Sequence, residues 1–252
     1  MVVIAVSNRK GGAGKTTVAV NLSVEFASQG KRVLLIDLDS QCHCSVAFSL
    51  KQSKDTASVH SLFKDSSVTL GSVIIPTGIE NLWIAPGNPF FNHGDGEKNL
   101  TRLKDAIWKE GLQEKFDYML IDTPPSLDAL LMNGILAATH IIVPFIPHHL
   151  SLEGVRQLIR ALFPIMSYEN RTLKILGFVP VMASERIKLH LKIREEISRN
   201  FGDPKMLHPI RSDIRLAEAF AVGKPIKIYA PTSKGAEDFR ELANEIEEKL
   251  RT

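Results

Sequence analysis

The strongest constraint on this chain is a glycine-rich turn that follows an apolar run at residues 2–6. The run is continuous and rich in β-branched side chains, which predicts a buried parallel strand. After the turn, a helix is expected over 15–29, ending at Gly30, a residue suited to a left-handed C-cap. Glycines let backbone N–H groups point at phosphate oxygens, and the helix adds its positive N-terminal end. The order strand, turn and helix therefore predicts a phosphate-binding loop.

The loop departs from the P-loop pattern G-x-x-x-x-G-K-[ST], because Arg9 stands where the first glycine belongs. In that pattern Lys15 reaches the β- and γ-phosphates of a nucleotide, and the Thr16 hydroxyl coordinates Mg²⁺. Thr17 is expected to contact the α-phosphate. The loop also holds a second lysine, Lys10. The expected nucleotide contacts are Lys10, Gly11, Gly12, Ala13, Gly14, Lys15, Thr16 and Thr17.

Two further strand patterns end in carboxylates. Asp37 ends the run at 32–37 with Asp39 just beyond it, and Asp122 ends the run at 118–122. Ligands of open α/β sheets bind at the carboxyl ends of the strands, so these side chains are expected beside the loop. Asp122 fits a Walker B role, and Asp39 is the candidate for orienting the attacking water; both are expected to reach Mg²⁺ through water. For Asp37, a supporting role at the strand end is favoured.

Strand and helix patterns alternate along the 252 residues. This alternation predicts an α/β fold, a single-domain P-loop NTPase over 1–252 with a mostly parallel, twisted sheet flanked by helices on both faces. The remaining strands are expected at 82–85, 140–145 and 175–181, and the remaining helices at 98–115, 151–167, 186–200, 213–221 and 234–250. Residues 40–97 are the least regular part of the chain.

Composition narrows the class of protein further. With 44% hydrophobic and 23% charged residues, the chain is long enough for one large core. No apolar run is long enough for a membrane span, and the first one is interrupted too early for a signal peptide, so we expect a cytoplasmic protein. Cys42 and Cys44 are its two cysteines. Their spacing disfavours a disulfide, and Cys-His-Cys alone is a poor metal site, so reduced, non-ligating thiols are favoured.

Positive charge is concentrated late in the chain. Residues 186–235 hold eleven basic and five acidic residues, a net charge of +6 against +3 for the whole chain. This asymmetry suggests a polyanionic partner for one face, and the alternative is a solvated helical surface. The terminal pattern at 234–250 instead combines an apolar stripe with an acidic outer face, which anionic lipid repels. We therefore expect this helix to pack on the core, and we expect no membrane binding.

Five segments together resemble the ParA/Soj group of partition ATPases, relatives of MinD: KGGAGKTT, DLDSQ, IDTPPS, VPFIPHHLSLEG and IRLAEAFAVGKPI. The resemblance covers nearly the whole chain. It implies a slow, partner-stimulated ATPase that uses ATP and Mg²⁺ and forms a homodimer when ATP is bound. It also implies that Lys10 contacts the phosphates of the other subunit while Lys15 serves its own. The implied catalytic residues are Lys10, Lys15, Asp39 and Asp122.

The chain departs from this family pattern in three places. Ser40, Cys42 and His43 stand where the family usually has Pro and then Gly-Asn. His148 stands where an acidic residue is frequent. The segment 209–213 resembles the adenine-contacting loop of the family, in a different residue order. It implies base contacts from Pro209, Arg211 and Asp213.

Members of this family differ in the surface that they bind, and the basic segment 186–227 favours non-specific DNA. Arg215 takes the place of a DNA-contacting arginine. Its expected companions are Lys188, Lys192 and Arg211. The leading hypothesis is a nucleoid-associated switch that segregates a chromosome or plasmid with a ParB-like partner. The alternative is the same ATPase positioning a protein cargo, such as a carboxysome or chemoreceptor array, through an adaptor. A metabolic P-loop enzyme ranks last.

Overall fold

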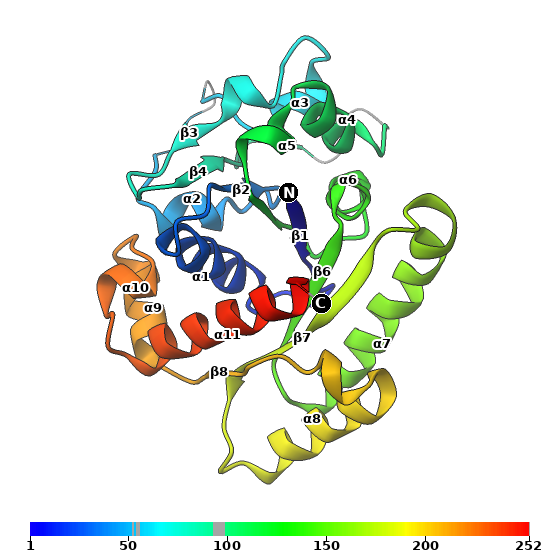
Figure 1. Cartoon of the computed structure of the whole chain (residues 1–252), viewed down its shortest axis with the longest axis vertical. Helices are drawn as coiled ribbons and strands as arrows, with labels where there is room; N and C mark the ends of the chain where they lie inside the picture. The colour runs from blue at the N-terminus through cyan, green and yellow to red at the C-terminus, as the bar shows by residue number, and fades with distance from the viewer. Residues whose placement is uncertain (52, 54–55, 93–98, 252) are drawn as a thin grey trace.

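The computed structural model describes residues 1–51, 53, 56–92 and 99–251. Its centre is an eight-stranded sheet in the order β3-β4-β2-β5-β1-β6-β7-β8 (Figure 1). All of these pairings are parallel except β3 with β4. The strands are β1 (Val2–Val6), β2 (Val33–Asp37), β3 (Ile75–Pro76), β4 (Leu82–Ala85), β5 (Tyr118–Asp122), β6 (His140–Phe145), β7 (Lys174–Ala183) and β8 (Ile210–Arg211).

Helices cover both faces of this sheet, as expected from the alternating pattern. One core cluster joins the sheet to α3, α4, α5, α6, α7 and α8, and the other joins it to α1, α2, α9, α10 and α11. The helices are α1 (Lys15–Ser28), α2 (His43–Ala47), α3 (Ser61–Lys64), α4 (Arg102–Lys109), α5 (Leu112–Lys115), α6 (Ala129–Ala137), α7 (His149–Pro164), α8 (Lys188–Phe201), α9 (Ile214–Ala221), α10 (Ile226–Tyr229) and α11 (Lys234–Arg251).

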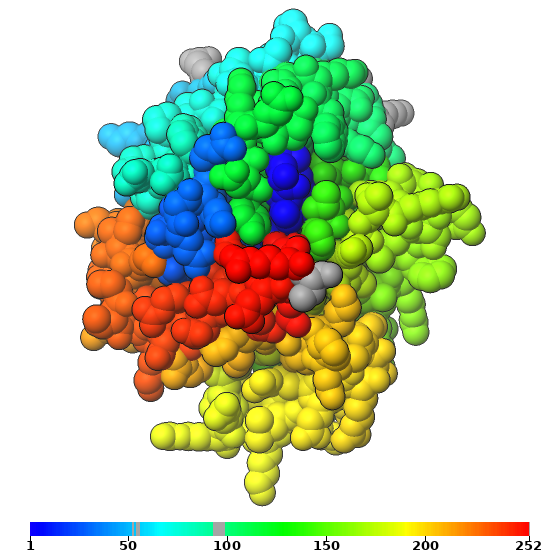
Figure 2. All heavy atoms as spheres, in the orientation of Figure 1, coloured from blue at the N-terminus to red at the C-terminus, as the bar shows by residue number. Residues whose placement is uncertain are grey.

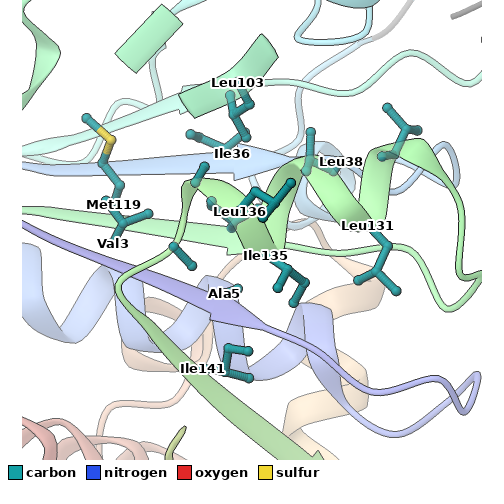
Figure 3. Close-up of a cluster of buried hydrophobic side chains, with 14 of the residues drawn as sticks. Val3, Ala5, Ile36, Leu38, Leu103, Met119, Leu131, Ile135, Leu136 and Ile141 are labelled. Atoms are coloured by element: carbon teal, nitrogen blue, oxygen red, sulfur yellow. The ribbon is translucent and has the colours of Figure 1, made fainter. Parts of the chain in front are cut away.

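The central strands are buried on both faces because successive side chains alternate between the two clusters. In β1, Val3 and Ala5 belong to the cluster under α6, whereas Ile4 and Val6 belong to the cluster under α1. Figure 3 shows the first cluster, where Ile135 and the other apolar side chains of α6 lie over the sheet. This double burial explains why the strands read as continuous apolar runs in the sequence.

The helix that follows the phosphate loop is held between the sheet and α11. Phe26 of α1 is fully buried and stacks on Tyr118 of β5 at a ring-centroid distance of 4.5 Å. α11 lies across the face seen in Figure 2, and its residues Phe239, Leu242 and Ile246 are fully buried. The prediction of a core-packed terminal helix is confirmed. Among the described helices, none has the length and apolar character needed to cross a membrane.

The prediction of one continuous helix over 98–115 is wrong. Residue 98 lies outside the described residues, and the structure has two helices, α4 and α5, with Gly111 between them at φ +66°. A left-handed residue ends a helix and redirects the chain, and glycine adopts this conformation at little cost. The predicted helix over 151–167 corresponds to α7, which begins earlier, at His149, and ends at Pro164, where a π-helical turn, Ile165–Glu169, continues from it.

The sequence patterns did not predict α6, which packs against α4 and the sheet. Its residues are apolar on nearly every side, so they carry no amphipathic period. The start of the helix did leave a signal, because Asp128 accepts hydrogen bonds from the backbone N–H groups of Leu130 and Leu131, both at 3.1 Å. An aspartate at this position is a favoured N-cap.

Gly177 of β7 lies where an added Cβ would be 2.5 Å from the backbone oxygen of Lys205 and 2.6 Å from Leu207 Cγ. We therefore predict that Gly177→Ala lowers the free energy of unfolding by about 1–3 kcal/mol through overpacking. Gly154→Ala is the control, because a Cβ on Gly154 in α7 meets no atom of the described residues within 4 Å. The control is expected to be neutral or stabilising in urea titrations, and equal losses in both variants would contradict the prediction.

Candidate functional site

Parallel register brings three strand ends to one edge of the sheet. β5 lies between β2 and β1, and Asp122 is paired with Asp37 on one side and with Val6 on the other. The phosphate-loop sequence follows β1 directly, so it leaves the sheet beside both carboxylates. The fold therefore gathers the predicted loop and the predicted carboxylates at the carboxyl edge, where open α/β sheets bind their ligands.

The loop has the backbone conformation that its glycines permit. Gly12 has φ +73° and Gly14 has φ +83°, and Gly14 is the N-cap of α1. Gly11 and Gly12 are exposed, and within the part of the chain that the structure describes a Cβ on either would meet no atom within 4 Å. Because Gly14 offers no side chain to cap α1, the first N–H groups of the helix remain available to an anion. The arrangement suits a phosphate group.

Lys15 and Thr16 point into the sheet edge. Lys15 is only 7% exposed, and burial lowers the pKa of its ammonium while the carboxylates of Asp122 and Asp39 oppose that shift. The Thr16 hydroxyl donates a hydrogen bond of 2.6 Å to Asp122 Oδ2. The structure thus brings together Lys15, Thr16, Asp39 and Asp122, as the sequence predicted. Thr17 is half-buried beside them in the first turn of α1.

The two strand-end carboxylates are fully buried side by side. Burial raises the pKa of Asp122 to about 6, and burial together with the neighbouring Asp122 carboxylate raises that of Asp37. Asp37 Oδ2 and Asp122 Oδ1 receive no hydrogen bond within the described part of the chain. Two orphaned buried oxygens beside the Thr16 hydroxyl fit a divalent cation with oxygen ligands, such as Mg²⁺.

Asp39 and Asp37 hold the loop that follows β2. Asp37 Oδ1 accepts the backbone N–H of Asp39 at 3.3 Å, and Asp39 Oδ1 accepts that of Gln41 at 3.0 Å. These contacts agree with the supporting role expected for Asp37. Asp39 is half-buried, so its carboxylate stands at the border between the buried cluster and solvent.

Lys10 lies in a different environment from Lys15. Its Nζ atom is 2.7 Å from Nε2 of His148, which immediately precedes α7. Burial and the nearby Lys10 ammonium lower the pKa of His148, which favours a neutral imidazole that accepts this hydrogen bond. Asn8 fixes the base of the loop by accepting the backbone N–H of Lys10 at 2.9 Å. The two lysines of the loop therefore lie in separate environments, Lys15 beside the carboxylates and Lys10 beside His148.

The predicted base-contacting residues have structural contacts of their own. Arg211 donates to Asp238 from its Nε atom at 2.9 Å and also pairs with Glu237. Asp213 caps α9 by accepting the backbone N–H of Arg215 at 3.0 Å, and it also accepts that of Gly235 at 2.9 Å. These contacts fix the segment after β8 against α11. Pro209 lines an open groove of about 630 Å³ beside them.

The predicted DNA-contacting residues do not share one environment. Lys188 and Lys192 are exposed one turn apart on α8, and Arg215 is exposed in the first turn of α9. The charge of Arg211, in contrast, is compensated by the two carboxylates described above. The groove of about 630 Å³ adds Arg186 and Arg194 from the α8 side.

Several other cations of the basic segment are engaged in structural contacts. Lys227 pairs with the buried Glu25 at 2.7 Å, and Lys205 donates to the backbone oxygen of Ile175 at 2.5 Å. Arg199 pairs with Glu195 along α8 at 3.4 Å. Fewer cations are therefore available to a polyanion than the eleven basic residues counted in the sequence of this segment.

The sequence reading assigned no role to Cys44, and the structure gives it one. Both cysteines are free and buried, which agrees with reduced thiols. Cys44 Sγ donates to Asp122 Oδ2 at 3.4 Å, so the thiol reaches the carboxylate cluster. The spacing of the two cysteines could not reveal this contact, because the partner of Cys44 comes from β5. Cys42 Sγ lies 3.4 Å from the backbone oxygen of Ser40 instead.

Comparisons with known proteins agree with the geometry. A family model described as "AAA domain" matches residues 1–175. The chain is 34% identical to the sporulation initiation inhibitor protein Soj of Bacillus subtilis over 249 residues, covering 97% of each protein. It is 31% identical to the chromosome partitioning protein ParA of Caulobacter vibrioides over 249 residues, covering 97% of this chain and 93% of that protein.

Solved structures share the fold over the full length. The septum site-determining protein MinD of Pyrococcus horikoshii, complexed with Mg-ADP, has a TM-score of 0.82 and 28% identity, with 99% of this chain and 97% of that chain covered. Cobyrinic acid a,c-diamide synthase of Mycobacterium smegmatis, with bound ADP and magnesium, also has a TM-score of 0.82 and 28% identity, covering 100% and 96%. Apo McdA of Cyanothece has a TM-score of 0.85 at 20% identity, covering 99% of each chain, a likeness of fold alone.

The raised pKa of Asp122 makes stability depend on pH in a predictable direction. Its native pKa of about 6 lies above the ordinary value of 3.8, so the native state holds the proton more tightly than the unfolded chain. The carboxyl therefore contributes stability that is fully present below pH 3.8 and is lost as the pH rises through about 6. At neutral pH the nucleotide-free protein has lost this contribution, at most about 3 kcal/mol.

We predict that Asp122→Asn flattens this dependence and raises the melting temperature of the nucleotide-free protein at pH 7.5, measured calorimetrically without Mg²⁺. Asp105→Asn, which removes a partly exposed carboxylate on α4, is the control and is expected to keep the wild-type slope. A wild-type slope in Asp122→Asn would contradict the prediction.

Proposed function

We propose, from the premise that this chain belongs to the ParA/Soj family of P-loop ATPases, that it is an ATP-dependent dimerising switch that segregates or positions DNA. In this proposal, ATP drives two copies together, the dimer binds DNA without sequence preference, and hydrolysis releases it. The observation that carries the proposal is the separation of the two loop lysines. Lys15 is buried beside Asp122, whereas Lys10 extends to His148.

The phosphate loop supplies the nucleotide contacts. The N–H groups of Gly11, Gly12, Ala13 and Gly14 bind phosphate oxygens, and Lys15 neutralises the β- and γ-phosphates. Thr17 binds the α-phosphate. The base contacts of Pro209, Arg211 and Asp213 remain predictions. The segment that holds them is fixed to α11 by Asp238, which gives the base a rigid wall.

The carboxylate cluster fits Mg²⁺, as its two orphaned buried oxygens indicate. Thr16 would hold the ion directly, and Asp39 and Asp122 would hold its water ligands. When bound, Mg²⁺ neutralises charge on the phosphates. Asp39 stands at the solvent border of the cluster, where its carboxylate can orient the attacking water. The buried Asp122 carboxylate accepts a hydrogen bond from the Thr16 hydroxyl and so holds the Thr16 side chain beside the proposed Mg²⁺ site.

In the proposed dimer, each copy contributes its Lys10 side chain to the nucleotide bound by the other copy. A cation delivered across an interface neutralises charge that develops on the transferred phosphoryl group, as an arginine finger does. In the proposed dimer, Lys10 leaves His148, its contact in the single chain, and binds the second nucleotide. Apolar side chains at the same edge support pairing. Leu127 and Leu150 follow the ends of β5 and β6, Met182 lies next to the last residue of β7, and each is more than half exposed.

Non-specific DNA is the proposed surface that the dimer binds. Lys188 and Lys192 on α8 and Arg215 on α9 are exposed cations that can face phosphates. One copy offers few such contacts, and a dimer doubles them, so affinity becomes dependent on ATP. A ParB-like protein that stimulates hydrolysis would then set the lifetime of the bound state, in the cytoplasm at the nucleoid.

The second candidate function uses the same ATPase to position a protein cargo, such as a carboxysome or chemoreceptor array, through an adaptor. The identities of 31–34% to Soj and ParA favour the DNA role. A pull-down with Asp39→Ala protein and ATP discriminates between them. Capture of a centromere-binding protein supports partition, and capture of a cargo adaptor supports the alternative.

The switch predicts that ATP controls both dimerisation and DNA binding. With a non-hydrolysable ATP analogue, sedimentation should show dimers and a gel shift should show bound DNA. With ADP, both should be absent. Lys15→Ala should lose nucleotide binding, whereas Lys10→Ala should bind nucleotide and stay monomeric. Equal DNA shifts with ATP, with ADP and in Lys15→Ala would refute the switch.

The DNA surface predicts a salt-sensitive loss. Replacing Lys188 and Lys192 together by Ala should weaken binding equally for all DNA sequences. It should lower the slope of log affinity against log salt by about 2 for each copy, or about 4 for the dimer. Arg199→Ala is the control on the same helix, because Arg199 is already paired with Glu195. An unchanged slope in the double variant would exclude α8 from the interface.

A further inference from the structure

Three side chains with metal-ligating atoms meet beneath the phosphate loop. Asp37 ends β2, Asp122 ends β5 and Cys44 lies in α2, and one ligand atom from each lies within 4.8 Å of the other two. All three residues are fully buried. Ligands of a four-coordinate ion lie about 3.5 Å apart, so small side-chain rotations would bring these atoms onto one ion.

The cluster is incomplete without a cation. Asp37 Oδ2 and Asp122 Oδ1 are buried and receive no hydrogen bond from the described residues. A buried polar atom left in this state costs about 1–3 kcal/mol. Two adjacent carboxylates also repel each other in a low-dielectric surrounding, and a positive ion between them removes both penalties.

The thiol determines which class of ion the cluster prefers. Cys44 Sγ already contacts Asp122 Oδ2 at 3.4 Å, so sulfur and carboxylate oxygen face the same point. Thiolate is a soft ligand that favours zinc and its congeners over Mg²⁺. Three protein ligands leave a fourth position open, as in zinc sites that bind water or substrate.

We propose that Asp37, Cys44 and Asp122 form a three-ligand site for a thiophilic divalent cation of the zinc and cadmium class. On binding, a bond forms between the cation and Cys44 Sγ, and the thiol proton passes to solvent. The two carboxylates and the thiolate carry three negative charges, which the ion and the neighbouring Lys15 ammonium together balance. The proposal rests on this cluster alone and holds whether or not the chain binds DNA.

Occupation of this site would compete with the Mg²⁺ of the proposed ATPase. Both ions need Asp122, and a thiophilic ion would take Asp122 Oδ2 from the Thr16 hydroxyl that now donates to it. Binding of zinc to this cluster would therefore affect nucleotide turnover through Cys44, a residue that lies outside the P-loop.

The test is a cadmium titration of the full, nucleotide-free chain without Mg²⁺, followed by the ultraviolet charge-transfer band of a cadmium–thiolate bond. The wild type should develop this band to saturation at one ion per chain. Cys44→Ser should lose the band and bind cadmium at least about tenfold more weakly in competition with a chromophoric chelator. Cys42→Ser is the matched control, because Cys42 lies two residues before Cys44, at the N-cap of α2, but outside the cluster, and it should titrate like the wild type.

The melting temperature is a second readout, which distinguishes a loss of cadmium binding from a folding defect. Cadmium should raise the melting temperature of the wild type and of Cys42→Ser, because a ligand that binds the native state stabilises it. Asp122→Asn retains the thiol and should keep a weakened band. The proposal is overturned by absence of the band in the wild type, by its persistence in Cys44→Ser or by its loss in Cys42→Ser. Loss of ATP-dependent DNA binding in the wild type would count against the proposed switch alone.

Discussion

The register between β2, β5 and β1 is the constraint on which the rest of the structure depends. It aligns Asp37 with Asp122 and Asp122 with Val6, so two carboxylates and the start of the phosphate loop leave the sheet together. Because helices cover both faces of the sheet, these carboxylates are buried, and their mutual repulsion must be offset by cations. Lys15 supplies one positive charge from α1. The electrostatics of the site therefore follow from strand order before any ligand is considered.

Much of this arrangement could be predicted because it is written in short, local patterns. Continuous apolar runs predicted β1, β4, β5 and β6 at their observed limits, and Gly30 was expected to be left-handed after α1, as its φ of +80° shows. The family resemblance and the ATPase class are confirmed by relatives matched over nearly the whole chain. The meeting of Thr16, Asp39 and Asp122 could be foreseen, since parallel strands bring their carboxyl ends to one edge.

What could not be predicted depends on contacts between distant segments. The buried α6 has no amphipathic period, and the break at Gly111 depends on a single left-handed residue. Charge counting treated every cation of the basic segment alike, whereas Asp238 and Glu25 neutralise Arg211 and Lys227 from other helices. Cys44 was judged by its spacing from Cys42, and its actual neighbour lies 78 residues along the chain. Local spacing carries no information on such partners.

The contact between Lys10 and His148 bears on how readily two copies come together. In the dimer proposed above, each subunit would hold the ammonium group of Lys10 on its own His148, so association would begin by exchanging one hydrogen bond for another. An uncharged ring releases a cation at a smaller electrostatic cost than a carboxylate at the same place would. In the proposed switch, His148 would therefore hold Lys10 only weakly in the single subunit, and the energetic threshold for pairing would stay low.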